Sequence, residues 1–357
     1  MSRLRESLRT FYPGYFALVM ATGIVGIASH RLGYPAVATA LLAFNVAAYA
    51  VLWALTLARL AWHPRRMAAD LADHAAGPGF FTVVAGTAVL GGQILVTTGH
   101  RAAAEALWWF ACVLWTGLIY AFFTAVTVRT DKPPFVQGLS GAWLIAVVAT
   151  QSVPVLGGLL ALGDPDPHPV RVFFLLAMFL FGGMLYLLII NLIFYRFTFF
   201  DFPPEMLTPP YWINMGAVAI TTLAGATLTL LAPRSELLGP LSPFLAGLTL
   251  FFWATATWWI PLLVILGVWR HGVRRVSFAY HPSYWGMVFP LGMYTACTLQ
   301  LAAAVDAPFL TPISEGFVFV SWLAWALTFV GLVRALGRAV AGGRRDAATV
   351  SAEPEGR

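Results

Sequence analysis

The chain has 357 residues, of which 60% are hydrophobic and only 10% are charged, against roughly 25% charged in soluble domains. Apolar stretches long enough to cross a bilayer core of about 30 Å recur along the whole chain, so we predict an all-α integral membrane protein and no sizeable soluble domain. The formal net charge is +6. The arginines of the chain are scattered over loops and form no basic face, so we expect no nucleic-acid partner.

Ten transmembrane helices are predicted from the apolar runs and from the Pro, Gly and charged residues that interrupt them. In chain order they cover residues 12–30, 34–62, 79–98, 101–128, 138–163, 170–196, 209–232, 243–272, 279–303 and 314–338. We expect residues 1–11 to be a cytoplasmic N-terminal segment, residues 12–338 to form one transmembrane transport domain, and residues 339–357 to be a disordered cytoplasmic tail.

Positive charge is distributed unevenly over the two sides of the predicted bundle. If the N-terminus is cytoplasmic, 17 of the 21 Lys and Arg residues lie on the inner side, and only Arg31, Arg101, Arg171 and Arg234 lie on the outer side. This excess predicts a multi-pass protein of the cytoplasmic membrane with both termini in the cytoplasm.

Cys112 and Cys297 lie within predicted spans, where we expect buried small side chains and not metal ligands. We predict no metal and no cofactor.

The odd and even spans differ in composition. Eleven of the 14 tryptophans fall in even-numbered spans, whereas the odd spans are rich in small residues, as in VMATGIVGIAS (19–29) and TVVAGTAVLGG (82–92). Large side chains suit lipid, and small ones let helices approach closely or leave open space. We therefore predict an inner ring of odd helices around a central pore, surrounded by the even helices.

A weak repeat supports this plan. Each odd span opens with an aromatic residue at a comparable depth, followed by small residues; these are Phe16, Phe81, Trp143, Trp212 and Trp285, at spacings of 65, 62, 69 and 73 residues. The pattern predicts five helical hairpins repeated in parallel about an axis along the membrane normal. The preference of aromatic residues for membrane interfaces is the simpler explanation for the aromatic position alone.

No Asp, Glu, Lys, Arg or His lies inside the ten predicted spans away from their ends, which argues against a carboxylate proton relay or an acid–base enzyme. The odd spans carry hydroxyl and amide groups instead. We expect two groups of residues to line the pore. The first is the five aromatic residues at the starts of the odd spans, and the second is the polar residues Thr22, Thr87, Thr150, Gln151, Thr221 and Thr295. Alternatively, each Thr bonds back to its own i−4 carbonyl. A neutral, wet pore with a basic cytoplasmic rim would favour anions.

Prolines interrupt two odd spans, at Pro154 and at Pro290, and we expect each to kink its helix beside the pore. In the stretch YWGMVFPLGMYT (284–295), Phe289 stands directly before Pro290, with Gly286 and Gly292 on either side. We expect the two glycines to leave space beside the phenylalanine ring.

The stretches FYPGYFALVMATGIVGIAS and YWGMVFPLG, within the ten-span plan, resemble the tellurite-resistance/dicarboxylate transporter family. That family includes plant slow-type anion channels, bacterial TehA, and fungal malate and sulfite transporters. The resemblance implies a homotrimer in which each protomer has its own pore, and it implies that Phe289 plugs this pore as a gate. The motifs MATG and FPLGMYT are similar to the malate and sulfite branch.

We therefore expect passive transport of a small anion, such as chloride, nitrate, sulfite or a C4-dicarboxylate like malate, and no enzymatic activity. Proton-coupled or exchange transport of a dicarboxylate or sulfite is the alternative. A membrane enzyme acting on a lipid-linked substrate is a remote one, because Asp70 and Asp73 are the only acidic pair that could hold a divalent cation near an interface.

Overall fold

The computed structural model describes residues 2–350, with side chains for residues 5–338, and this part of the chain folds into helices without any strand. Ten of its helices are long and apolar enough to span a membrane, which confirms the predicted fold class. They are α2 (Ala17–Arg31), α3 (Pro35–Trp62), α5 (Phe81–Thr98), α6 (Arg101–Val128), α8 (Ile145–Leu162), α9 (Pro169–Phe199), α10 (Ile213–Leu231), α11 (Ser242–Val268), α12 (Trp285–Ala304) and α13 (Thr311–Val350). The shorter helices are α1 (Ser2–Arg9), α4 (Pro64–Leu71) and α7 (Phe135–Gly138).

Five of the long helices form a closed inner ring. Helix α2 contacts α5, α5 contacts α8, α8 contacts α10, α10 contacts α12, and α12 returns to contact α2. Between 78% and 94% of the residues in the membrane-length stretches that contain these helices are buried, against 17% to 50% in the other five spans. The odd-numbered spans of the sequence are thus the buried ones.

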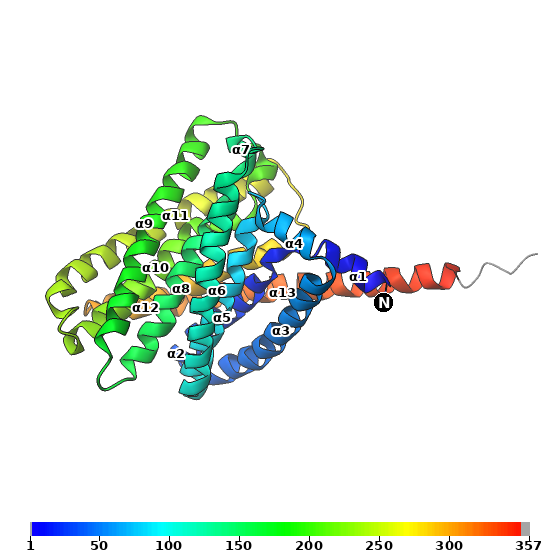
Figure 1. Cartoon of the computed structure of the whole chain (residues 1–357). Coiled ribbons are helices and arrows are strands. Elements are labelled where there is room, and N and C mark those ends of the chain that lie inside the picture. Colours follow the sequence, from blue (N-terminus) through cyan, green and yellow to red (C-terminus); the bar gives the residue numbers. More distant parts are fainter. Residues whose placement is uncertain (1, 351–357) are drawn as a thin grey trace, which may run out of the picture.

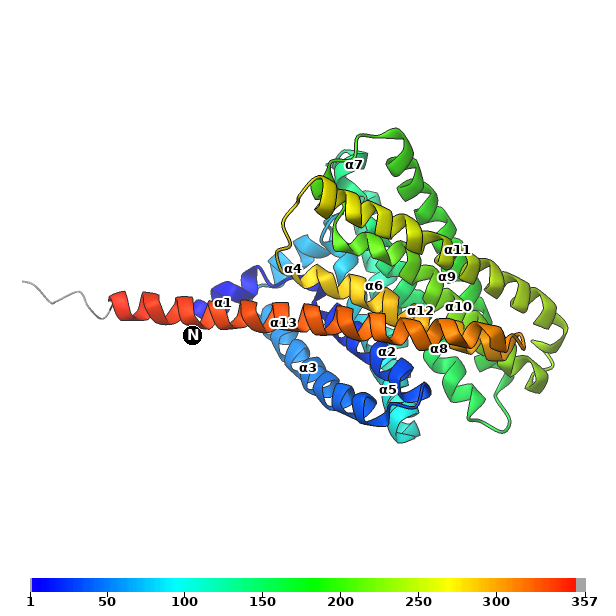
Figure 2. The ribbon, with the colours of Figure 1, turned by 180° about the vertical axis from the view of Figure 1, so that it is seen from behind.

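The other five long helices cover the ring from outside. Each packs against the inner helix that precedes it in the chain and against the next inner helix in the ring, so that α3, for example, contacts both α2 and α5. Figures 1 and 2 show the result from opposite sides, with α13 running along the outside of the bundle in Figure 2. Each outer helix thus bridges two neighbouring helices of the inner ring.

Every inner helix begins with a tight 3₁₀ turn that carries the predicted aromatic residue or directly precedes it. The turns are η1 (Pro13–Phe16), η2 (Gly77–Phe80), η3 (Gly141–Leu144), η5 (Pro209–Trp212) and η9 (Pro282–Tyr284). Four of the five have a proline in their first positions, where its missing N–H has no helical partner to lose. The turns contact one another in a second closed ring, so the five inner helices start at the same end and run parallel.

Arginines near the ends of four outer helices attach these helices to the loops around the 3₁₀ turns. Arg59 pairs with Asp70, and its guanidinium also donates to the carbonyl of Arg9 at 3.3 Å. The other three donate to backbone carbonyls: Arg129 to Ala72, Arg196 to Leu139 and Arg270 to Leu207. Much of the positive charge at this end of the bundle therefore has a structural role.

The two described ends of the chain lie on the same side of the bundle, where Figure 1 shows α1 beside the protruding end of α13. This is the topology of an even number of spans. Helix α13 continues to Val350, beyond the predicted end of the last span at residue 338. The final part of the predicted tail, residues 351–357, lies outside the described residues.

We predict that Gly141→Ala destabilises the ring of 3₁₀ turns. A Cβ at Gly141 would lie 2.5 Å from the Pro210 carbonyl oxygen and 2.6 Å from the Tyr211 Cα, and backbone atoms cannot move aside cheaply. The expected cost is about 1–3 kcal/mol, seen as a lower thermal unfolding temperature in detergent. Gly117→Ala is the control, because nothing lies within 4 Å of its added Cβ. Equal unfolding temperatures for both variants would contradict the close packing of the turns.

Candidate functional site

Two small cavities lie inside the ring, and both are lined by all five of its helical segments. The N-terminal cavity, near the 3₁₀ turns, is lined by Tyr12, Gly14, Ala17, Met20, Thr82, Ile145, Val148, Pro210, Ile213, Ser283, Gly286 and Phe289. The C-terminal cavity, toward the other end of the helices, is lined by Ile24, Ile27, Arg31, Ala88, Val89, Gly92, Ser152, Val155, Leu159, Leu223 and Met293. Each has room for about one water molecule.

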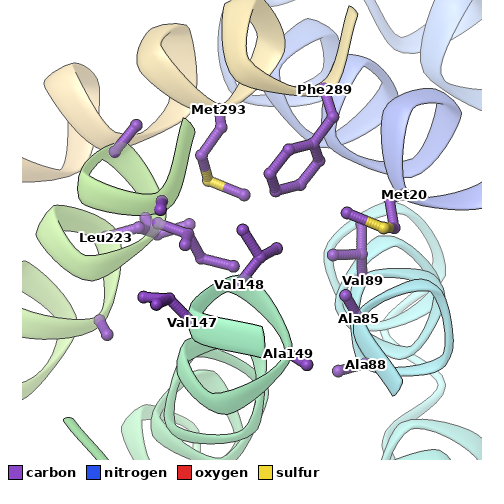
Figure 3. Close-up of a cluster of buried hydrophobic side chains, with 14 of the residues drawn as sticks. Met20, Ala85, Ala88, Val89, Val147, Val148, Ala149, Leu223, Phe289 and Met293 are labelled. Atoms are coloured by element: carbon purple, nitrogen blue, oxygen red, sulfur yellow. The ribbon is translucent and has the colours of Figure 1, made fainter. Parts of the chain in front are cut away.

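An apolar layer separates the two cavities. Figure 3 shows the Phe289 ring pointing from α12 into the middle of the ring, toward Val148 of α8 and close to Met20 of α2. Met293, one helical turn further along α12, lines the C-terminal cavity, whereas Phe289 lines the N-terminal one. All four side chains are buried and none carries a nitrogen or oxygen atom. Phe289 thus belongs to an uncharged, apolar layer inside the ring.

The residues around Phe289 have distinct roles. Pro290 is accommodated by Gly216 of α10, where an added Cβ would lie 2.6 Å from the proline Cγ. A Cβ at Gly292 would lie 3.0 Å from the methyl carbons of Ile24 and Val25, so this glycine serves close packing of α12 on α2 and does not leave space beside Phe289. Only Gly286, which lines the N-terminal cavity, matches that expectation. Pro154 is buried in α8 and lines neither cavity.

The hydroxyls predicted to line the pore point away from it. Thr22 accepts a hydrogen bond of 3.0 Å from the indole of Trp325, and Thr150 accepts one of 2.9 Å from Trp115. The Thr87 hydroxyl lies 2.9 Å from that of Tyr49. All three partners belong to outer helices. Each Thr lies two residues from ring-facing neighbours, and two residues turn an α-helix by about 200°.

The remaining polar candidates also line neither cavity. Gln151 donates to the Phe179 carbonyl of α9 at 2.9 Å, whereas Thr221 and Thr295 donate to the carbonyls four residues earlier in their own helices. The bonding back to the i−4 carbonyl that competed with a pore-lining role is therefore what these two hydroxyls do. None of the six predicted polar residues lines either cavity, and the hydroxyl residues that do are Tyr12, Thr82, Ser152 and Ser283.

The five aromatic candidates pack away from the cavities as well. Phe16 contacts Tyr49 and Trp53 edge to face, Phe81 contacts Phe122 in the same way, and Trp285 contacts Trp325; all of these partners lie on outer helices. The Trp143 indole donates to the Gly138 carbonyl at 2.8 Å, and Trp212 lines a groove beside α11. These residues fasten the starts of the inner helices to their surroundings.

The side chains that do face the cavities follow a helical spacing that sequence reasoning missed. In α2 they are Ala17, Met20, Ile24, Ile27 and Arg31, three or four residues apart, which places them on one helix face. The same spacing connects Ala88 and Gly92 in α5, and Val148, Ser152 and Val155 in α8. The three- and four-residue spacing is visible in the sequence, but which face of each helix is turned inward is known only from the structure.

Ionisable groups are absent from most of the described ring. The five inner helices contain no Asp, Glu or Lys, and His30 and Arg31 occupy the last turn of α2. Asp70 is paired with Arg59 and Arg66, and Asp73 accepts the backbone N–H groups of two residues that follow it. Within residues 5–338, no three His, Cys, Asp or Glu side chains gather as a metal site. These carboxylates stabilise a loop.

The sequence matches a protein-family model described as voltage-dependent anion channel, SLAC1, over residues 10–333. The chain belongs to this anion-channel family. Its members transport ions and are not enzymes, so the lipid-linked enzyme considered above is excluded. The match spans all ten long helices, up to the middle of α13, and includes Phe289 and both cavities.

Individual relatives are similar over about half to nine-tenths of the chain. An uncharacterized membrane protein of Mycobacterium tuberculosis is 36% identical over 168 residues, covering 47% of this chain and 85% of that protein. An uncharacterized transporter of Methanocaldococcus jannaschii is 23% identical over 92% of this chain and 95% of its own length. A sulfite efflux pump of Trichophyton rubrum is 24% identical over 90% of both chains. The family member described here is thus a multi-pass membrane protein for anion transport.

We predict that Thr150→Val lowers stability and leaves transport unchanged. The change removes the acceptor for the Trp115 indole and costs about 1 kcal/mol, measurable as a lower unfolding temperature. Thr116→Val is the control, because the exposed Thr116 hydroxyl bonds only to the Cys112 carbonyl of its own helix. Altered anion selectivity at unchanged stability would instead mean that the Thr150 hydroxyl faces the permeating ion.

Proposed function

We propose that small anions cross the membrane through the middle of the inner ring and that Phe289 is the gate. The observation that carries this proposal is the arrangement of two cavities, each lined from all five inner segments, on either side of the layer around Phe289. The family match supplies the class of cargo. The fully buried Phe289 ring represents the closed state.

The apolar layer closes the path because an anion there loses its water and finds no replacement. Effective penalties for burying an unpaired ion are on the order of several kcal/mol, and hydrophobic constrictions gate pores by excluding water. Rotation of the Phe289 ring toward Gly286, which has no side chain, would join the two cavities. The path would then be neutral over most of its length, so an ion would pass without being held.

Sulfite is the first candidate cargo, because a relative aligned along nine-tenths of both chains is named as a sulfite efflux pump. Nitrate and chloride share its small size and negative charge, and malate is the larger candidate implied by the resemblance. Passive movement down the electrochemical gradient fits an inner ring without a carboxylate in the described residues. Accumulation driven by a pH gradient would instead mark the second candidate, a proton-coupled transporter.

The proposed setting is the cytoplasmic membrane, with the N-terminal end of the ring and both chain termini in the cytoplasm. The excess of Lys and Arg at that end supports this orientation. Large apolar side chains on the outer helices, such as Trp109, Phe173 and Leu323, are exposed and suit contact with lipid or with further copies of the chain. A homotrimer with one path in each protomer is the assembly that we propose.

We predict that Phe289→Ala raises anion flux by at least about tenfold in proteoliposomes loaded with nitrate, chloride or sulfite. A tenfold change corresponds to about 1.4 kcal/mol removed from the barrier, well within the penalty that the closed layer imposes. Phe289→Leu, which keeps part of the bulk, should fall between wild type and the alanine variant.

Phe179→Ala is the matched control. Phe179 is as completely buried as Phe289, but it lies on α9 and packs against Phe252, away from both cavities. The control should lose stability, by about 3–5 kcal/mol at most, without gaining flux. Unchanged flux in a folded Phe289→Ala protein, or equal gains in both variants, would overturn the gate.

A further inference from the structure

Among the residues that the structure describes, Arg31 is the one basic side chain that lines either cavity inside the ring. It lies in the last turn of α2 and reaches the C-terminal cavity, together with apolar residues and Ser152. The cavity is continuous with the path assigned above, so the inference that follows rests on the proposed function. A positive charge at this place acts on any anion that enters or leaves the path at its C-terminal end.

The charge of Arg31 has no acidic partner within the described part of the chain. No carboxylate oxygen lies within 4.0 Å of its guanidinium, whereas two of the other three arginines at this end pair with a carboxylate. Arg171 pairs with Glu105 at 3.1 Å, and Arg101 pairs with Asp164 at 3.6 Å. Arg234 is exposed and donates to the carbonyls of Leu162 and Asp164. Arg31 therefore keeps its capacity to attract an anion.

The hydrogen bond between Arg31 and Gln300 orients a second donor. Arg31 Nη1 donates to Gln300 Oε1 of α12, and this amide orientation is required because a guanidinium can only donate. The Gln300 amide nitrogen has no hydrogen-bond acceptor among the described residues, and it is not one of the buried polar atoms left without a partner. Its two N–H groups thus remain available beside the arginine.

We propose that Arg31 and Gln300 form a binding site for a small oxyanion at the C-terminal mouth of the path. The planar guanidinium presents several N–H donors in a fixed fork that matches two oxygen atoms of one anion, and the Gln300 amide adds a donor to a further oxygen. A halide is a single atom, so it is attracted by the positive charge but cannot accept from two N–H groups of the guanidinium through two separate oxygen atoms. The site therefore favours oxyanions such as sulfite or nitrate over chloride.

The partial exposure of Arg31 keeps this binding reversible. Arg31 is only partly buried, and the cavity beyond it is lined mostly by apolar side chains. An anion held at the mouth keeps part of its hydration and moves on when the gate opens. Conduction needs binding of this kind, which favours entry without trapping the ion.

The test compares nitrate, sulfite and chloride flux in proteoliposomes for wild type, Arg31→Gln and Arg31→Lys. The anion concentration is varied on the side of the C-terminal mouth. Arg31→Gln should raise the half-saturating nitrate and sulfite concentrations by about tenfold or more, the loss expected for a charge-assisted hydrogen bond. Arg31→Lys keeps the charge but not the fork, so it should retain chloride flux while its preference for oxyanions falls. Gln300→Leu should lower that preference in the same direction.

Arg234→Gln is the matched control, because it removes one positive charge from the same end of the bundle without touching either cavity. It should leave half-saturation and selectivity at their wild-type values. Equal kinetics for wild type, Arg31→Gln and Arg31→Lys, or equal effects of Arg31→Gln and Arg234→Gln, would overturn the site. If Arg31→Gln fails to fold, unchanged oxyanion preference in Gln300→Leu and Arg31→Lys overturns it equally.

Calorimetric titration of the detergent-purified protein with nitrate separates this inference from the proposed function. Nitrate binding that is lost in Arg31→Gln, in a protein that shows no flux of any anion, supports the site and contradicts the pathway. Flux that responds to Phe289→Ala but not to Arg31→Gln or Arg31→Lys supports the pathway and contradicts the site.

Discussion

Each polar group at membrane depth must find a hydrogen-bond partner within the protein, because lipid offers none. The inner helices meet this requirement largely on their outward faces. Trp325, Trp115 and Tyr49 of the outer helices bond to threonines of the inner ring, and the Trp253 indole donates to Thr298 at 2.9 Å. The remaining outer helix, α9, bonds to the inner ring through Tyr186, whose hydroxyl donates to the Asn214 carbonyl of α10 at 3.3 Å. These bonds attach the two layers and leave the centre of the ring to apolar side chains.

This division of groups explains how a ring of neutral helices can serve an ion. In the function proposed above, the apolar layer around Phe289 closes the path by the loss of hydration and not by a bound counter-charge. Charge appears at the ends instead. Arg31 lines the C-terminal cavity, and the arginines that attach the outer helices to the loops lie at the opposite end of the bundle. Positive charge at the two ends and a neutral middle together fit the proposed passage of an anion in either direction.

The sequence predicted the parts of the fold that depend on hydropathy and spacing. The ten spans, the burial of the odd ones and the aromatic residue at each inner-helix start all follow from length, composition and repeat. Phe289 was singled out by the resemblance, and its ring lies in an apolar cluster inside the inner ring, where it lines the N-terminal cavity.

Which side of each inner helix is turned toward the centre of the ring could not be predicted in the same way. Helices α2, α5 and α8 carry apolar residues on every side. They therefore lack the contrast between a polar and an apolar face that reveals orientation in soluble helices. A threonine such as Thr22 reads equally well as a pore-lining group or as a partner for an outer tryptophan. Only the position of Trp325, 303 residues along the chain, decides between them.

The most direct test of the path is blockade by an anionic thiol reagent during electrical recording from the purified protein. Cysteines are introduced singly at Gly92 and Gly286, one in each cavity, and at the lipid-facing Gly117, with Cys112 and Cys297 replaced by alanine. If the path runs through the ring, the reagent reduces anion current irreversibly for the cysteines at Gly92 and Gly286 and not for the one at Gly117. Current that persists after complete labelling at both cavity positions would show that anions cross elsewhere.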